Sequence, residues 1–324
     1  MRRAAILLVL LLVCLSAGVA FALFGASSPV EGNTFSTKAD WEAPSASRSV
    51  IAKTVGYSAG YIKQGASYYV YADITDGGNP ASGVSTATAD VSTIDTGQTA
   101  VALASGSFSI EGVSYNRRSA SLTANGTLSA GTYAYTVTMT DVEGNSTTQT
   151  GFSVVVDNTA PAASDIQTTN VAGGTVGRAQ TGDTITYTYS EPMDPNSILS
   201  GWTGASTNVV LRLDDGGGLL GLGDDTVEIY NSTNTTRLPI GSVNLDRNDY
   251  TSSDRTFGAS GTPSTMVMSG NSITITLGTA SGSVSTASGT GSMSWTPSAT
   301  AQDRAGNACS TSSRTETGAA DKEF

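Results

Sequence analysis

Carboxylates are the main side chains of this chain that could do chemistry, because its 324 residues include 27 Asp and Glu, two Cys and no His. Without imidazole the chain lacks the usual general base, the Ser-His-Asp and Cys-His nucleophile systems, and the commonest zinc or copper ligand. Carboxylate oxygens suit glycoside hydrolysis and the binding of hard cations such as Ca²⁺. Glycoside hydrolysis and the binding of a hard cation are therefore the two chemistries that the composition allows.

Two sets of residues have the composition of a calcium site. The first is a glycine-rich loop with four aspartates: Asp214, Asp215, Asp224 and Asp225. The second gathers turn and linker residues near the middle of the chain: Asp141, Glu143, Asp157 and Asn158. Asp, Asn and Gly are favoured in turns without any metal, and this explanation is the stronger one for both sets. We therefore expect no metal ligands and no cofactor, with Ca²⁺ as the alternative.

No residues form a catalytic pattern. Glu191 and Asp194 could supply a carboxylate pair with one of the loop aspartates, but nothing in their spacing places two carboxylates across a cleft. The three tryptophans, Trp41, Trp202 and Trp295, are dispersed, so core or interface positions explain them more simply than sugar-stacking platforms. The sequence thus predicts a protein that is not an enzyme.

The N-terminus has the pattern of an export signal. Arg2 and Arg3 precede an apolar run over residues 4–26, and Ala20-Phe21-Ala22 is a small-x-small cleavage pattern. We expect cleavage near residue 22 or 26, with an uncleaved membrane anchor as the alternative. Either reading places the rest of the chain outside the cell or on its surface, and it touches a membrane only through this segment. The net charge of −11 argues against a nucleic-acid partner.

The two cysteines cannot form a disulfide framework. Cys14 lies inside the apolar run, so a processed chain keeps only Cys309. We expect Cys309 to be packed as a small apolar residue, with an intermolecular disulfide as the alternative.

The elements that must position these residues are short strands joined by turns. The phrase D-x-x-G-N occurs at 141–145 and again at 303–307, which predicts a tight turn between antiparallel strands near the end of each half. Glu111-Gly112 has the spacing of a two-residue hairpin turn, and a short helical turn is expected over residues 195–202. Runs of alternating, β-branched or aromatic residues predict strands at 67–74, 132–140, 152–156, 209–213, 226–230, 266–268 and 273–277. A further strand is expected within residues 182–194, ending in S-E-P-M-D.

Parts of both halves resemble the bacterial Ig-like repeats of surface proteins and adhesins. The first half carries Leu128-x-x-Gly131-x-Tyr133, its D-x-x-G-N turn and the phrase D-N-T-A-P at 157–161; the second carries the phrase S-E-P-M-D at 190–194. The resemblance implies an all-β fold of two tandem Ig-like antiparallel sandwiches after an N-terminal apolar helix. It also implies that Tyr133 is a tyrosine corner, whose hydroxyl ties a loop to the next strand. Residues 32–41 are similar to the region after the signal in camelysin-like biofilm-matrix proteins.

These observations predict four segments: a signal peptide or anchor at 1–26, an extended leader at 27–44, and sandwiches at 45–157 and 158–324. The expected function is that of an exported bacterial surface or matrix protein, acting in adhesion or as a structural spacer. The alternatives are a carbohydrate-binding or carbohydrate-active module, and a fibre subunit that donates a strand from its leader. The expected partners are other surface proteins, glycans or neighbouring copies.

Overall fold

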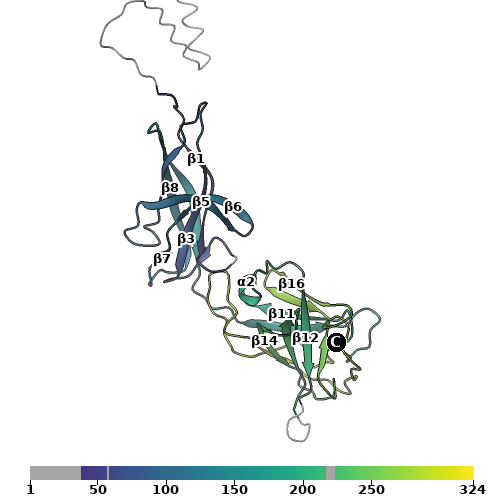
Figure 1. Cartoon of the computed structure of the whole chain (residues 1–324). Coiled ribbons are helices and arrows are strands. Elements are labelled where there is room, and N and C mark those ends of the chain that lie inside the picture. Colours follow the sequence, from purple (N-terminus) through teal and green to yellow (C-terminus); the bar gives the residue numbers. More distant parts are fainter. Residues whose placement is uncertain (1–37, 57, 217–222) are drawn as a thin grey trace, which may run out of the picture. The chain divides into compact units, whose positions relative to one another are not determined.

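A computed structural model describes residues 38–56, 58–216 and 223–324. The expected signal or anchor and most of the leader lie outside this part of the chain. The described chain is nearly all β and forms two sheets, and residues Ala39–Phe324 belong to one compact unit. We call the strands of the first sheet, β1–β9, the first module and those of the second, β10–β19, the second module (Figure 1).

The described residues of the first module form nine strands. They are β1 (Ser45–Lys53), β2 (Tyr61–Ile62), β3 (Ser67–Thr75), β4 (Val84–Asp90), β5 (Val101–Ile110), β6 (Val113–Ser119), β7 (Leu122–Thr123), β8 (Gly131–Asp141) and β9 (Ser146–Val156). Strand β5 pairs with β4 at its start and with β6 over the rest of its length, so it joins the layer β1-β3-β6 to the layer β4-β8-β9-β2. Apolar side chains at alternate positions of β8, such as Tyr135, Val137 and Met139, point into the core between the layers.

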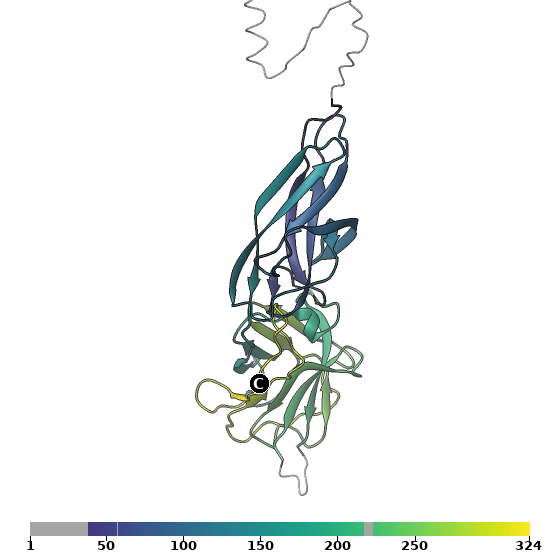
Figure 2. The same ribbon diagram turned by 90° about the vertical axis from the view of Figure 1, so that its left-hand side faces the viewer.

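Outside residues 217–222, the second module contains ten strands and the helical turn α2 (Pro195–Ile198). Figure 2 shows the ribbon turned by 90°. The strands of the second module are β10 (Ala163–Thr169), β11 (Thr184–Tyr189), β12 (Thr207–Asp214), β13 (Thr226–Asn231), β14 (Arg237–Asn244), β15 (Arg255–Phe257), β16 (Ser264–Ser269), β17 (Ser272–Thr276), β18 (Ser294–Thr296) and β19 (Arg314–Thr315). The centre of its core is Trp295, which has no exposed surface and meets the rings of Tyr187 and Tyr189 edge-on at 5.2 and 4.8 Å.

Several local expectations are confirmed. Glu111 and Gly112 both have positive φ and close the β5–β6 hairpin in register, as a two-residue turn requires. The turn at 141–145 joins β8 to β9. The hydroxyl of Tyr133 donates a 3.0 Å hydrogen bond to Ser129 O, the contact that the tyrosine-corner resemblance implies.

Three local expectations need correction. Strand pairing is not wholly antiparallel, because β2 runs parallel to β9. The turn at 303–307 does not join two regular strands; it is closed by the single bridge Gln302↔Ala308. The expected helical turn over 195–202 is a helix of only four residues, because Leu199 returns to extended backbone.

Candidate functional site

The same polar phrase opens each module. Asp40-Trp41-Glu42-Ala43-Pro44 precedes the first and Asp157-Asn158-Thr159-Ala160-Pro161 precedes the second, so D-x-x-A-P is repeated as D-x-x-G-N is. In the first module Asn145 Nδ2 donates to Asp40 O at 3.1 Å, and in the second Asn307 Nδ2 donates to Asp157 O at 2.9 Å. The opening phrase and the closing turn are therefore tied together in the same way in both modules. The repeat of D-x-x-A-P is visible in the sequence, where only the copy at 157–161 was expected to mark a boundary between modules.

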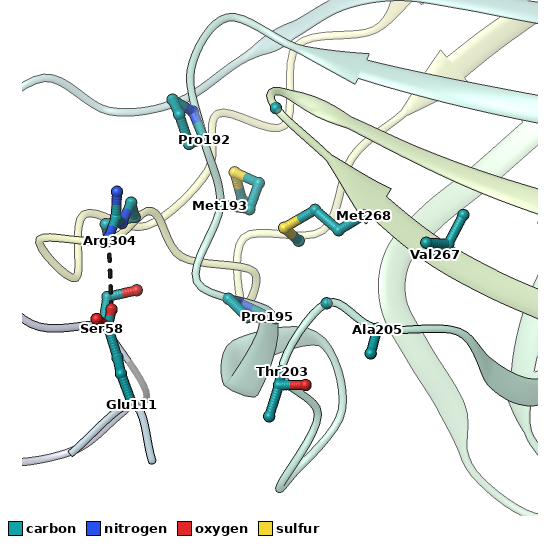
Figure 3. A pocket seen from close by; sticks show the side chains of 12 residues that line it. Ser58, Glu111, Pro192, Met193, Pro195, Thr203, Ala205, Val267, Met268 and Arg304 are labelled. Atoms are coloured by element: carbon teal, nitrogen blue, oxygen red, sulfur yellow. Dashed lines mark hydrogen bonds and ion pairs between the residues drawn. The ribbon is translucent and has the colours of Figure 1, made fainter. Parts of the chain in front are cut away.

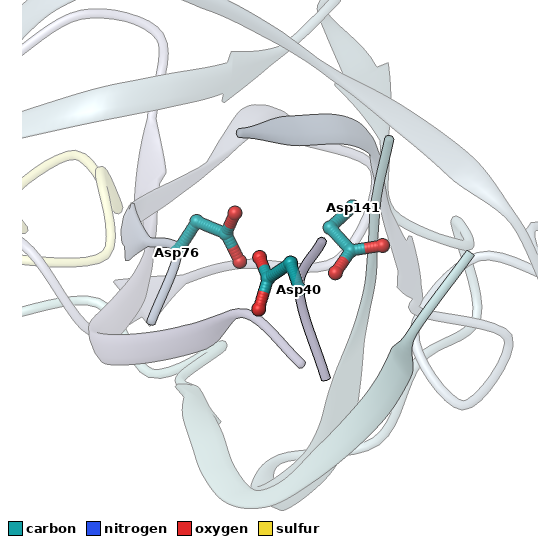
Figure 4. Close-up of side chains that lie close together, drawn as sticks. All are labelled: Asp40, Asp76 and Asp141. Carbon is teal, nitrogen blue, oxygen red and sulfur yellow. The ribbon is translucent and has the colours of Figure 1, made fainter. Parts of the chain in front are cut away.

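In the first module this arrangement gathers Asp40, Asp76 and Asp141, which we call the leader cluster (Figure 4). Asp40 and Asp141 are each 2% exposed. Backbone N–H groups of Glu42 and Ser82 lower the pKa of Asp40. Burial raises the pKa of Asp141, but hydrogen bonds from Asn145 outweigh it and lower this pKa overall. Asp76 Oδ2 accepts from the Gly83 N–H, whereas its buried Oδ1 has no hydrogen-bond partner among the described residues.

In the second module the corresponding carboxylates are Asp157, Glu191 and Asp303, the junction cluster. Burial raises the pKa of Glu191 to about 7, and the neighbouring Asp157 and Asp303 add to this effect. Burial also raises the pKa of Asp303, although its carboxylate accepts from Gly306 N, Asn307 N and Asn307 Nδ2 at 2.6, 2.7 and 2.7 Å. The hydrogen bonds of the turn thus occupy the carboxylate oxygens of Asp303. Glu191 is the residue of the junction cluster whose pKa lies near neutral pH.

The calcium residues suggested by the sequence are not brought together as expected. Asp141 and Asp157 belong to different clusters, and Glu143 belongs to neither. Asn158 serves the backbone instead, accepting from Gln64 N and donating to Leu128 O.

The aspartate-rich loop has a structural role in its described part, which excludes residues 217–222. The carboxylate of Asp225, with no exposed surface, accepts from the N–H groups of Tyr250 and Thr251 at 2.9 and 3.1 Å. Asp224 accepts from Asn244 Nδ2. These hydrogen bonds support the turn explanation for the two aspartates that close the loop.

A buried ion pair links the two modules beside the junction cluster. Lys53, the last residue of β1, is 7% exposed, and its Nζ lies 2.6 Å from Asp194 Oδ2 and donates to Asp303 O at 3.1 Å. Asp194 also caps α2 by accepting from Asn196 N, so its position is fixed by the second module itself. The glycine at Gly56 keeps this site open, because a Cβ there would collide with Lys53 and Asp194.

Further polar contacts surround this ion pair. Lys63 Nζ donates to Gly306 O at 2.6 Å. Arg304 makes a 3.4 Å ion pair with Glu111 and covers the ring of Tyr61 at 4.3 Å. The turn at 303–307 of the second module contacts four side chains of the first module, namely Lys53, Tyr61, Lys63 and Glu111. The turn at 303–307 is therefore the centre of the junction.

A pocket of about 600 Å³ opens next to the Arg304–Glu111 pair (Figure 3). It is lined mainly by apolar side chains, among them Met193, Pro195 and Met268. Its charged lining residues, Glu111 and Arg304, bind each other. The pocket therefore offers apolar surface, with this ion pair and the polar residues Ser58 and Thr203 at its wall.

The remaining candidates take structural positions, with one exception. Trp202 and Trp295 are buried and donate to the backbone oxygens of Ala205 and Ile240, as expected for core residues. Cys309 is 4% exposed, and burial raises its pKa to about 11, so its thiol is packed and unreactive at neutral pH. Trp41, by contrast, is 72% exposed.

The raised pKa of Glu191 predicts a stability that falls as the pH rises. A carboxyl group with a higher pKa folded than unfolded holds its proton in the native state, so stability is lost between the two pKa values, here about 4.5 and about 7. We expect Glu191→Gln to melt at a higher temperature than the unaltered protein at pH 8, and the difference to vanish at pH 4. Melting curves in chelator across this range check it, and a constant difference would contradict the assignment.

Comparison with known proteins adds no family to this picture. No protein-family model matches the chain, and no curated protein matches it either. In the described part of the chain, no helix has the length and apolar character needed to cross a membrane.

Proposed function

We propose that this chain is an exported bacterial surface or matrix protein, in which two Ig-like β-sandwiches form a rigid spacer that presents binding surfaces to a partner. The observation that carries this proposal is the buried Lys53–Asp194 ion pair between the modules. A buried pair holds its two partners in one geometry, because separating them would leave uncompensated charges in an environment of low polarity. A spacer needs this property, because a fixed junction keeps the two modules at one distance and in one orientation.

Three observations support the Ig-like assignment. Each module is opened by D-x-x-A-P and closed by D-x-x-G-N, with the same Asn-to-backbone hydrogen bond between them. The Tyr133 hydroxyl makes the loop contact of a tyrosine corner. The first module packs two layers of short strands around one core. Together they favour two copies of one kind of module.

A non-catalytic role is part of the proposal. It is supported by the lack of His in the whole sequence and by the structural duties of Asp194 and Asp303. The role needs no cofactor. Ca²⁺ at the leader cluster is the alternative, supported by Asp76 Oδ1, to which no described residue gives a hydrogen bond. A sugar-binding role is the second alternative, and the exposed Trp41 is the observation that favours it.

Calorimetry tests whether the modules act as one body. Because the junction is buried and charged, we expect the protein to unfold in a single transition whose calorimetric and van't Hoff enthalpies agree. Two separate transitions would contradict a rigid junction. Cell fractionation with N-terminal sequencing tests the export: the chain should be found at the surface or in the medium, and a cytoplasmic chain with its N-terminus intact would contradict it.

A further inference from the structure

Residues 316–324 form a strap that is held against the second module. After β19, the backbone of Glu316 donates to Met293 O, and Asp321 exchanges two hydrogen bonds with Gly291. Phe324 is 2% exposed, accepts from Gly177 N and meets the ring of Tyr250 edge-on. The segment from Glu316 therefore forms no strand of its own but is held in place by backbone hydrogen bonds and by the burial of Phe324.

Glu323, within this strap, is buried but only partly satisfied. It is 1% exposed. Its Oε2 accepts from Thr168 Oγ1 at 2.7 Å, and its backbone N–H donates to the Tyr250 hydroxyl at 2.7 Å. Its Oε1 is buried, and none of the described residues gives it a hydrogen bond. A buried carboxylate oxygen without a hydrogen-bond donor destabilises the folded state, and a bound proton or cation would remove this penalty.

Two more carboxylates share this place. Glu316, Asp321 and Glu323 each offer a carboxylate oxygen, and these oxygens lie within 4.8 Å of one another. Oxygen ligands of Ca²⁺ lie about 2.3–2.6 Å from the ion, so any two of them are at most about 5 Å apart. The spacing therefore fits ligands around a common ion. In the described part of the chain, no Lys or Arg forms an ion pair with any of the three.

We infer that Glu316, Asp321 and Glu323 form a binding site for a divalent cation, with Ca²⁺ as the best fit to three carboxylates at a partly open surface. Asp321 is exposed and Glu316 half-buried, which leaves room for water to complete the coordination. The bound ion satisfies Glu323 Oε1 and neutralises the repulsion among the carboxylates. It thereby fastens the strap to the module through Thr168 and Tyr250.

A proton is the competing occupant, because a proton shared among the carboxyl groups would also satisfy Glu323 Oε1. The Tyr250 hydroxyl accepts from the Glu323 backbone N–H and so faces the same site. A direct calcium titration separates the two occupants, since only a cation site takes up the added ion.

The test is calorimetric titration of the chelator-treated full chain with Ca²⁺ at pH 9. We expect Glu323→Gln and Asp321→Asn each to lose one binding site or to weaken it about tenfold or more. Asp321→Asn changes an exposed side chain without a hydrogen bond of its own among the described contacts, so it keeps the fold. Asp76→Asn, a substitution in the leader cluster, is the matched control and should leave this site unchanged.

The outcomes divide cleanly. One site lost in both strap variants and retained in Asp76→Asn supports the inference. Titrations that are the same for the unaltered chain and both strap variants at pH 9 overturn it, and assign a shared proton to the cluster. Sites lost only in Asp76→Asn would also overturn it and assign calcium to the leader cluster alone.

Discussion

Lys53→Met will destabilise the protein by about 3–5 kcal/mol, because it leaves the carboxylate of Asp194 buried without its cation. The substitution preserves most of the side-chain volume, so the loss reports charge more than packing. Calorimetry should then show two transitions in place of one, since the strongest contact across the junction is gone. Chemical denaturation followed by tryptophan fluorescence gives the change in free energy of unfolding.

Two variants control for the loss of charge alone. Arg48→Met removes an ion pair with Asp73 in which the Arg side chain is 49% exposed, and it should cost at most about 1 kcal/mol. Lys53→Met combined with Asp194→Asn should recover part of the loss, because Asn can still cap α2. A cost for Lys53→Met no larger than that for Arg48→Met would contradict the buried pair.

Asp303→Ala is expected to have the second largest effect, about 2–4 kcal/mol, since it removes the carboxylate that accepts from Gly306 N, Asn307 N and Asn307 Nδ2. Gly306 N keeps the backbone oxygen of residue 303 and Asn307 Nδ2 keeps Asp157 O, so the Asn307 N–H is the donor that loses its acceptor. It should also loosen the junction, because the turn that it supports presents Asp303 O to Lys53 and Gly306 O to Lys63. Chemical denaturation measures the loss of stability, and the distance between spin labels on the two modules measures the loosening of the junction.

Asp141→Ala is the matched control within the same chain. Asp141 holds its own turn in the same way, accepting from Asn145 N and Nδ2 at 2.7 and 2.6 Å, but that turn receives no Lys from another module among the described contacts. We expect a comparable loss of stability in the first module and no change in the distribution of distances between spin labels on the two modules. If Asp303→Ala and Asp141→Ala broaden that distribution equally, the turn at 303–307 has no special role at the junction.

The local structure was largely predictable from the sequence. Period-two alternation located strands such as β8, β12 and β17, and the Glu111-Gly112 spacing fixed a hairpin register, because these signals act between close neighbours in the chain. Strand β14 was missed, since Pro239 and Gly241 interrupt its pattern. The parallel β2–β9 pair was missed because β2 has only two residues and its register depends on a distant strand.

The candidate site was predictable only in part. D-x-x-G-N marked the two turns, yet nothing near Lys53 in the sequence points to Asp194, because tertiary packing brings these residues together. The grouping of Asp141 with Asp157 was wrong for the same reason: each pairs with the opening phrase of its own module. A search for repeats would have found D-x-x-A-P at 40–44 and 157–161 and indicated this arrangement.

The most direct test of a rigid spacer is the distance between spin labels on the two modules, measured by pulsed electron spin resonance. Thr148→Cys in the first module and Thr233→Cys in the second are exposed, whereas Cys309 is buried and will not react. The rigid junction predicts one narrow distance distribution in the otherwise unaltered chain and a broad one after Lys53→Met. A broad distribution before that substitution would contradict the proposed spacer.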